Sequence, residues 1–193
     1  MSVAAVVLAA GASRRLGRPK QDIVVAGETL LRRVVRLARE ACLSPVIVVT
    51  RPGTEYGHTF ESDRNIIVAI NRETDEGIAS SIRCGISIAL DHDVAGAVIL
   101  ACDQPALRAD HLRALVKDER RMTASAYAGS IGVPAYFPAD SFSSLLQLHG
   151  DVGARKLLVD AHAISADELS LDIDIEEDLA AARALLERAA TRR

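Results

Sequence analysis

The sequence predicts a single α/β domain over residues 1–193, in which helices cover both faces of a mostly parallel, mixed sheet. Short apolar runs alternate with segments of helical periodicity along the whole chain. The length of 193 residues suits one domain, and no linker, repeat or low-complexity tract divides it. The expected architecture is therefore a Rossmann-like three-layer sandwich.

Uninterrupted apolar runs mark the expected strands, because a strand buried on both faces of a sheet is apolar on both sides. The first run ends at Leu8 and is followed by Gly11. Strands are expected over residues 3–8, 46–50, 65–70, 97–102, 122–128, 132–137, 163–164 and 169–171. Helices are expected over residues 29–42, 78–89, 109–121, 139–148, 151–161 and 176–190, the first of them capped by Thr29.

The composition is that of an ordinary globular protein, with 49% hydrophobic and 25% charged residues, which argues against extensive disorder. Lys plus Arg number 23 and Asp plus Glu number 26, so the formal net charge is −3. This slightly acidic balance argues against a nucleic-acid partner.

The cysteines and the N-terminal run bear on the compartment. Cys42, Cys84 and Cys102 lie far apart without metal-ligand spacing, so we expect buried free thiols and a reducing, cytoplasmic compartment. The apolar run over residues 3–10 is far shorter than the roughly 18 residues of a membrane span. Its positive charges follow rather than precede it, unlike those of a signal peptide. The sequence therefore predicts no membrane association.

Small residues and clustered cations follow the first strand. Such a loop lets backbone N–H groups approach a ligand while the cations neutralise its charge, which suits a polyphosphate. The spacing fits neither a Walker A loop nor the GxGxxG pattern, and a solvated loop whose arginines reflect compositional bias is the alternative. The candidate residues are Leu8, Ala9, Ala10, Gly11, Ala12, Ser13, Arg14, Arg15 and Lys20, the last being one of three lysines in the chain.

Two further candidates follow from their positions on predicted elements. Asp103 comes directly after the strand over 97–102, at the edge where α/β folds bind ligands. It can hold Mg²⁺ or only stabilise a turn. Gly77 opens a predicted helix with Ser80 and Ser81 in its first turn. The N–H groups and hydroxyls there can hold a base edge or a ribose, or only cap the helix.

The segment LAAGASRRLGRPK, residues 8–20, resembles the signature of the molybdenum cofactor nucleotidyltransferases, and of their cytidylyltransferase branch in particular. The resemblance implies a fold of the nucleotide-diphospho-sugar transferase type. It also implies that residues 8–15 surround a nucleoside triphosphate, with Arg15 and Lys20 acting catalytically on its phosphates. The Ala9-Ala10-Gly11 form favours CTP over GTP.

Later segments resemble motifs of the same family in the same order. The segment from Asn71 to Gly85 implies base and ribose recognition by Gly77, Ser80, Ser81 and Gly85. The Asp-Gln-Pro triplet at 103–105 implies that Asp103 is a catalytic metal ligand. The segment over 172–179 implies that Asp174 assists the metal. Ile175 and Glu176 replace the Thr-Pro of the family pattern, and Glu176 can open the last helix by its charge.

Two segments resemble the part of the cytidylyltransferase family's sequence that lies on the molybdopterin side of the site. Sugar pyrophosphorylases lack both segments. The two segments read GVPAYF over 132–137 and GDVGAR over 150–155. Asp151 can equally be only the cap of the following helix. The resemblance implies that the molybdopterin pocket is bordered by Gly132, Pro134, Gly150, Asp151 and Arg155.

The expected function is Mg²⁺-dependent transfer of CMP from CTP to molybdopterin, with release of pyrophosphate. One alternative is a non-catalytic nucleotide- or molybdopterin-binding protein that delivers the cofactor to a molybdenum hydroxylase. Another is nucleotidyl transfer to a sugar or alcohol phosphate, against which the segment over 150–155 argues.

Overall fold

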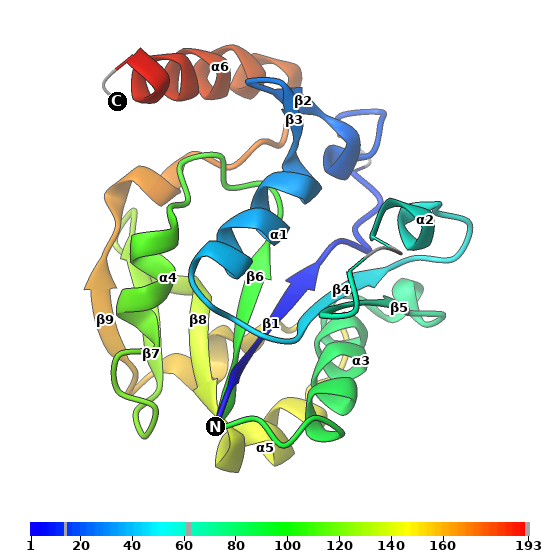
Figure 1. Cartoon of the computed structure of the whole chain (residues 1–193), viewed down its shortest axis with the longest axis vertical. Coiled ribbons are helices and arrows are strands. Elements are labelled where there is room, and N and C mark those ends of the chain that lie inside the picture. Colours follow the sequence, from blue (N-terminus) through cyan, green and yellow to red (C-terminus); the bar gives the residue numbers. More distant parts are fainter. Residues whose placement is uncertain (14, 61–62, 192–193) are drawn as a thin grey trace.

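A seven-stranded sheet forms the centre of the protein, in the order β5-β4-β1-β6-β8-β7-β9 (Figure 1). The computed structural model describes residues 1–13, 15–60 and 63–191. Strands β5, β4, β1 and β6 are parallel neighbours, β8 runs antiparallel to β6 and β7, and β9 is parallel to β7. Within the described residues, only β8 opposes the others. The bounds are β1 Val3–Leu8, β4 Val46–Thr50, β5 Ile66–Ile70, β6 Gly96–Ala101, β7 Thr123–Tyr127, β8 Ser130–Pro138 and β9 His162–Ser165.

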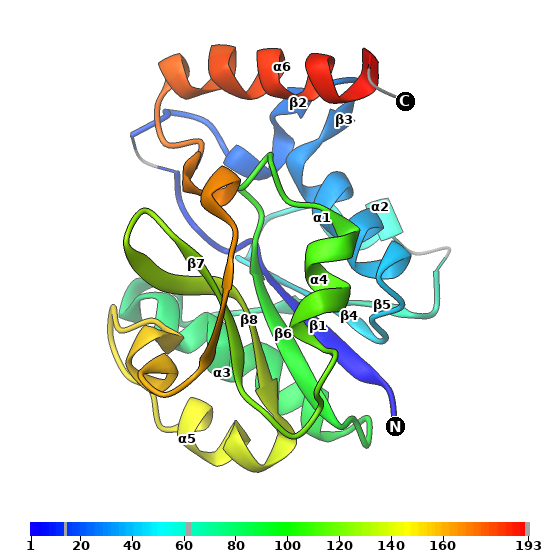
Figure 2. The ribbon, with the colours of Figure 1, turned by 90° about the vertical axis from the view of Figure 1, so that its left-hand side faces the viewer.

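Helices cover both faces of the sheet, which confirms the predicted α/β sandwich. Ala5 and Val7 of β1 pack with α1 and α4, whereas Ala4 and Val6 pack with α3 and α5. All four residues are fully buried, as expected for a strand covered on both faces. Figure 2 shows the two pairs of helices on opposite sides of the strands. The bounds are α1 Leu30–Glu40, α3 Ile78–Leu90, α4 Ala109–Leu115 and α5 Phe142–Leu146.

A separate, smaller apolar cluster, here called the small core, lies beside one end of the sheet (Figure 1). It packs α6 (Glu176–Thr191) against the antiparallel hairpin of β2 (Val24–Val25) and β3 (Glu28–Thr29). The hairpin turns at Ala26 and Gly27, whose φ angles are 52° and 81°. The buried members of the small core are Ile23, Val25, Leu30, Ile173, Leu179, Ala182 and Leu186.

Several elements differ from the sequence prediction. The prediction of a strand over residues 169–171 is wrong, because Asp167–Ser170 forms a 3-10 helix. There Leu169 N–H donates to Ala166 O at 2.8 Å, so the segment closes on itself rather than pairing with the sheet. The helix expected over 151–161 is a 3-10 helix over Ala154–Leu158, and the one expected over 109–121 ends at Leu115. The helix expected over 139–148 divides into a 3-10 turn and α5. The sequence did not predict the hairpin or α2 (Tyr56–Phe60).

The three cysteines are free thiols, as predicted, but their burial differs from the prediction. Only Cys102 among them is buried, whereas Cys84 is half-buried and Cys42 is exposed. Cys42 follows the end of α1 with a φ of 62°, so the chain turns there before the side chain can join the apolar face of the helix. In the part of the chain that the structure describes, no helix has the length and apolar character needed to cross a bilayer.

Candidate functional site

Three segments that are distant in sequence bring charged side chains together beyond β1 and β6. Lys20 Nζ lies 3.1 Å from Asp103 Oδ2 and also contacts Asp174 Oδ1. Arg15 Nη1 lies 3.2 Å from Asp174 Oδ2. Asp103 follows β6, Lys20 follows the loop after β1, and Asp174 precedes α6. The structure thus places these four predicted site residues in one cluster, and Arg14 lies outside the described residues.

The position of Asp174 depends on the start of the last helix. Ile173 N–H donates to Asp103 O at 3.0 Å, which ties this segment to the end of β6. Asp178 Oδ2 accepts the N–H groups of Asp174 and Ile175 at 2.8 and 2.9 Å. The helix begins at Glu176, as predicted, and Glu176 also pairs with Arg18 at 2.7 Å. The first turn of α6 therefore has its own anchor without the proline of the family pattern.

Burial and the charges of the cluster together shift the pKa values of Lys20 and Asp172. Burial lowers the pKa of Lys20, but hydrogen bonds and charges from Asp174 and Asp103 outweigh it and raise the pKa above its ordinary value. Lys20 therefore stays protonated at neutral pH. Partial burial, with the carboxylates of Asp103 and Asp174, raises the pKa of Asp172 to about 6. Asp172 retains exposed surface, so solvent screens part of this effect.

The loop after β1 is braced from beneath by Gln21, a residue that the sequence analysis missed. Gln21 is only 4% exposed, and its Nε2 donates to Ala9 O at 2.6 Å and to Gly11 O at 3.3 Å. Ser13 Oγ accepts the N–H of Lys20 at 3.0 Å. Gln21 thus engages two loop carbonyls from within, while Gly11 and Ala12 are exposed. A Cβ at Gly11 would meet no heavy atom within 4 Å, so the surface of the loop is open to a ligand.

The start of α3 carries the expected base and ribose residues, but most of their polar groups already have partners. Gly77 is the N-cap, as predicted. Asn71 Nδ2 donates to Ser80 Oγ at 2.9 Å and to Ser81 Oγ at 3.0 Å, and Ser80 Oγ donates to Gly77 O at 2.8 Å. Both serines are buried. These bonds order the turn itself, and the recognition of a base stays a prediction.

Gly85 has a packing role in the structure. It is buried on α3, and a Cβ there would lie 2.3 Å from Val6 Cγ1 and 3.1 Å from Val49 Cγ2. The absence of a side chain lets α3 lie close to the sheet. Helix packing accounts for this glycine without a nucleotide contact.

The residues expected on the molybdopterin side fall into two groups. Gly150 and Asp151 lie against the start of α3, where a Cβ on Gly77 would be 2.7 Å from Gly150 O and 2.8 Å from Asp151 N. The N-cap of the 3-10 helix over 154–158 is Gly153, so Asp151 does not cap it. Gly132 lies beside Arg155, since a Cβ on it would be 3.6 Å from Arg155 Nη2.

Gln104 connects the second group to the charged cluster, and sequence reasoning missed this role. Its Nε2 donates to Val133 O at 3.3 Å and to Tyr127 Oη at 3.2 Å. Pro134, the next residue after Val133, has its carbonyl occupied by the Ser125 hydroxyl at 2.7 Å. Because Gln104 follows Asp103 directly, it holds the strand that carries Gly132 and Pro134 next to the metal candidate. The resemblance of the Asp-Gln-Pro triplet to the family motif is the signal in the sequence that marks Gln104.

Asp103 and Asp174 have the donor chemistry of a divalent-cation site. Their carboxylates converge on one ammonium group, that of Lys20, so both can reach a single cation. No cluster of three or more His, Cys, Asp or Glu ligands occurs among residues 1–13, 15–60 and 63–191. Two carboxylates completed by phosphate oxygens and water suit Mg²⁺. The residues present fit that ion.

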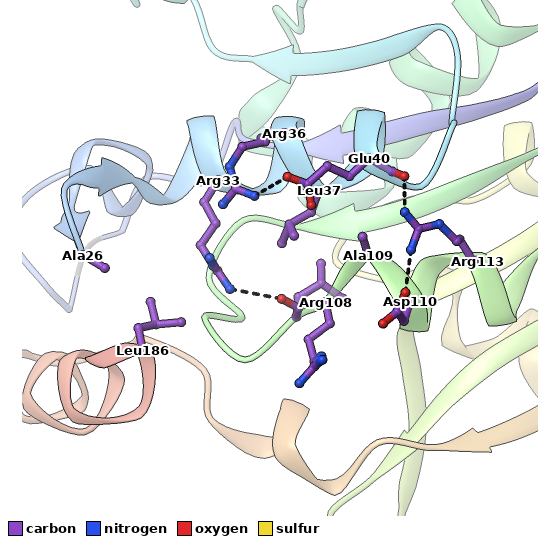
Figure 3. A pocket seen from close by; sticks show the side chains of 11 residues that line it. Ala26, Arg33, Arg36, Leu37, Glu40, Arg108, Ala109, Asp110, Arg113 and Leu186 are labelled. Carbon is purple, nitrogen blue, oxygen red and sulfur yellow. Dashed lines mark hydrogen bonds and ion pairs between the residues drawn. The ribbon is translucent and has the colours of Figure 1, made fainter. Parts of the chain in front are cut away.

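A groove of about 520 Å³ lies elsewhere, between α1, α4 and α6 (Figure 3). Its arginines serve largely to hold elements together. Arg36 on α1 pairs with Glu28 of β3, and Arg113 on α4 donates to Glu40 O at the end of α1. The groove is lined by Ala26, Arg33, Arg36, Leu37, Glu40, Leu107, Arg108, Ala109, Asp110, Arg113 and Leu186. None of the predicted site residues is among them.

The α/β sandwich, the open loop after β1 and the cation–carboxylate cluster define a nucleotidyltransferase class of protein. Residues 5–165 match the MobA-like NTP transferase domain, and the chain belongs to that family. The match ends before Asp174, so the last helix lies outside it.

Two curated proteins are similar in sequence. The chain is 33% identical over 162 residues to the purine catabolism protein PucB of Bacillus subtilis, covering 79% of this chain and 78% of that protein. It is 35% identical over 112 residues to a probable molybdenum cofactor guanylyltransferase of Opitutus terrae, covering 56% of this chain and 51% of that protein. The resemblance to the molybdenum cofactor family is thereby confirmed.

Solved structures share the fold over nearly the whole chain. Rv0371c of Mycobacterium tuberculosis superposes with a TM-score of 0.78 and 26% identity, covering 95% of this chain and 98% of that one. A second structure of Rv0371c is a complex with manganese, with a TM-score of 0.73 and 24% identity at the same coverage. Solved nucleotidyltransferases have the same architecture, which confirms the predicted nucleotide-diphospho-sugar transferase fold.

Proposed function

We propose that this protein transfers CMP from CTP to molybdopterin, with or without molybdenum, and releases pyrophosphate. The observation that carries the proposal is the convergence of Lys20, Asp103 and Asp174 beside an open, small-residue loop. Such an arrangement offers backbone donors, a fixed positive charge and two carboxylates at one place. Those are the groups that the triphosphate of a nucleotide with its cation requires.

In the proposed reaction, a terminal phosphate oxygen of molybdopterin attacks the α-phosphorus of CTP. A new P–O bond forms, and the bond from the α-phosphorus to the bridging oxygen of the β-phosphate breaks, releasing pyrophosphate. The attacking phosphate is anionic at neutral pH, so no general base is required. Rate enhancement comes from positioning and from stabilising charge on the phosphates.

Each residue of the cluster has a role in the proposal. Lys20 and Arg15 neutralise phosphate oxygens, and the exposed residues of the loop over 8–13, Gly11 and Ala12, offer backbone N–H groups. Asp103 and Asp174 would hold Mg²⁺, which when bound supplies Lewis-acid stabilisation of phosphate charge. Gln21 keeps the loop carbonyls turned inward. Gly77, Ser80 and Ser81 would face the base and ribose, and Gly132, Pro134, Gly150, Asp151 and Arg155 would border molybdopterin.

The nucleotide is the least constrained part of the proposal. The Ala9-Ala10-Gly11 form favours CTP, whereas one similar protein is named as a probable guanylyltransferase. The similarity to a purine catabolism protein supports a second candidate, in which the same pocket carries the cofactor to a molybdenum hydroxylase. We propose a cytoplasmic location for either role.

The deciding experiment measures pyrophosphate release with CTP, GTP, ATP and UTP in turn, each with molybdopterin, with a sugar phosphate or without an acceptor, and with Mg²⁺ or EDTA. Release that requires CTP, molybdopterin and Mg²⁺ together supports the proposal. Release with GTP in place of CTP would correct the nucleotide, and release with a sugar phosphate in place of molybdopterin would correct the acceptor. Nucleotide binding without turnover would favour the carrier.

A further inference from the structure

The geometry points to Glu76 as a positioning residue that holds the loop over residues 148–151 against the start of α3. This loop carries two of the residues proposed for the acceptor side, and the start of α3 carries those proposed for the nucleotide side. The assignment of the loop to the acceptor and of the start of α3 to the nucleotide rests on the proposed function. The sequence motifs did not single out Glu76 or Arg83. The inference gives both residues a role in holding the acceptor side of the site against the nucleotide side.

Glu76 and Arg83 together hold both ends of the loop. Glu76 Oε1 accepts the N–H of Gly150 at 3.1 Å. Arg83, which lies on α3 seven residues after Glu76, donates from Nη1 to Glu76 Oε1 and to Leu148 O, each at 2.7 Å. Arg83 Nη2 donates to Glu76 Oε2 as well as to Glu73 Oε2. The guanidinium therefore fixes the carboxylate and the start of the loop, while the carboxylate fixes the loop at Gly150.

The backbone completes the clamp. Ala79 N–H, in the first turn of α3, donates to Gly150 O at 3.2 Å. Gly77 has a φ of 113° and no room for a Cβ, because the backbone of residues 150–151 occupies that space. The N–H of Gly150 and its carbonyl are thus both bound to the segment over 76–79. The neighbouring residues Ser80 and Ser81 take their hydrogen bonds from Asn71 on the other side of the same turn.

The charges favour a rigid clamp rather than a loose surface contact. The side chains of Arg83 and Glu76 are 20% and 31% exposed, so both are screened less than a fully exposed ion pair. The Arg83 guanidinium and the Gly150 N–H lower the pKa of Glu76 to about 2. The carboxylate is therefore ionised throughout the neutral range, and its bond to Gly150 is charge-assisted. The segment over residues 76–79 thus anchors the acceptor loop directly before the proposed nucleotide contacts at Ser80 and Ser81.

The kinetic test compares Glu76→Ala and Glu76→Gln with a matched control, Glu28→Gln. Glu28 is 27% exposed and pairs with Arg36 through both carboxylate oxygens, so its variant removes an equivalent charge pair away from the site. We expect Glu76→Ala to raise KM for molybdopterin about tenfold, with KM for the nucleotide changed less than about twofold. Glu76→Gln, which retains an acceptor for the Gly150 N–H, should recover part of that loss. Equal effects on both KM values, or the same effect from Glu28→Gln, would overturn the inference.

A second measurement does not depend on the acceptor. Amide hydrogen exchange of residues 148–151 is followed with and without CTP or GTP, each with Mg²⁺. In the unmodified protein, nucleotide should slow exchange in this loop, and Glu76→Ala should abolish the slowing at saturating nucleotide. Slowing that persists in the variant, or none in the unmodified protein with either nucleotide, refutes the inference. Absence of molybdopterin-dependent pyrophosphate release would instead refute the proposed function and leave this test decisive.

Discussion

Replacing Gly77 by alanine tests whether close backbone contact between two loops supports the fold as well as the site. Gly77 has φ 113° and ψ −170°, a region that is essentially restricted to glycine. The new Cβ would lie 2.7 Å from Gly150 O and 2.8 Å from Asp151 N. Both are backbone atoms of a clamped loop, so neither can move away as a flexible side chain would.

The expected cost has two parts. The unfavourable φ and ψ cost about 1–3 kcal/mol, and relief of the backbone contact adds about 1 kcal/mol or more by analogy with overpacked cores. A total of about 3 kcal/mol lowers Tm by roughly 6–12 °C in a protein of this size, at roughly 2–4 °C per kcal/mol. The turnover of the proposed reaction should fall as well, because the acceptor loop is displaced.

Gly129→Ala is the matched control for this prediction. Gly129 also has a positive φ, 70°, but a Cβ there would meet nothing within 4 Å. Its replacement should cost only about 1 kcal/mol, or roughly 2–4 °C. Thermal unfolding followed by circular dichroism measures both shifts. Equal shifts for the two variants would refute the reasoning, since the contact with residues 150–151 would then contribute nothing.

Three other predictions concern the charged cluster. Asp103→Ala should reduce pyrophosphate release by about 10³-fold with Tm changed by only a few degrees, and near-normal release would remove Asp103 from the proposed metal site. Lys20→Arg keeps the charge but replaces a compact ammonium by a planar fork, so turnover should fall at least about tenfold; unchanged turnover would show that charge alone suffices. Asp172 has its pKa raised to about 6, so between about pH 4 and 6 the native state holds a proton that the unfolded chain has released. The free energy of unfolding should therefore decline as pH rises through that range. Asp172→Asn should remove the decline in Tm measured in EDTA, and an unchanged pH profile would count against the shift.

The central strands were predictable because their sequences leave little choice. Val3–Leu8 and Val46–Thr50 are continuous apolar runs, and the structure has them at the predicted bounds. The hairpin was not predictable in the same way. Its strands have two residues each, and its turn uses Ala26-Gly27 rather than a typical Asn-Gly pair. Packing against α6, about 150 residues further along the chain, and the ion pair between Glu28 and Arg36 stabilise so short a pair.

The residues of the site also divide into those that could be predicted from the sequence and those that could not. Residues at strand ends or inside contiguous motifs, such as Asp103 and Lys20, could be found from sequence. Gln21 could not, because its function depends on reaching back to the carbonyls of Ala9 and Gly11. Glu76 lies in the 3-10 turn before Gly77 and Arg83 lies on α3, and their shared target is a loop some 70 residues away in the sequence. Contacts of this kind follow from the tertiary structure alone.

The small core has a consequence for how the protein loses activity. Asp103 follows a strand of the large sheet. Asp174, in contrast, follows Ile173, and the carbonyl of Lys20 accepts the N–H of Ile23. Both isoleucines belong to the small core. The charged cluster therefore spans a seam between two separately packed regions. Local opening of α6 and the hairpin exposes far less buried surface than global unfolding, so it requires less free energy. A population with an intact sheet and a dismantled charge cluster should thus precede unfolding on heating, and activity would disappear before the secondary structure of the sheet does.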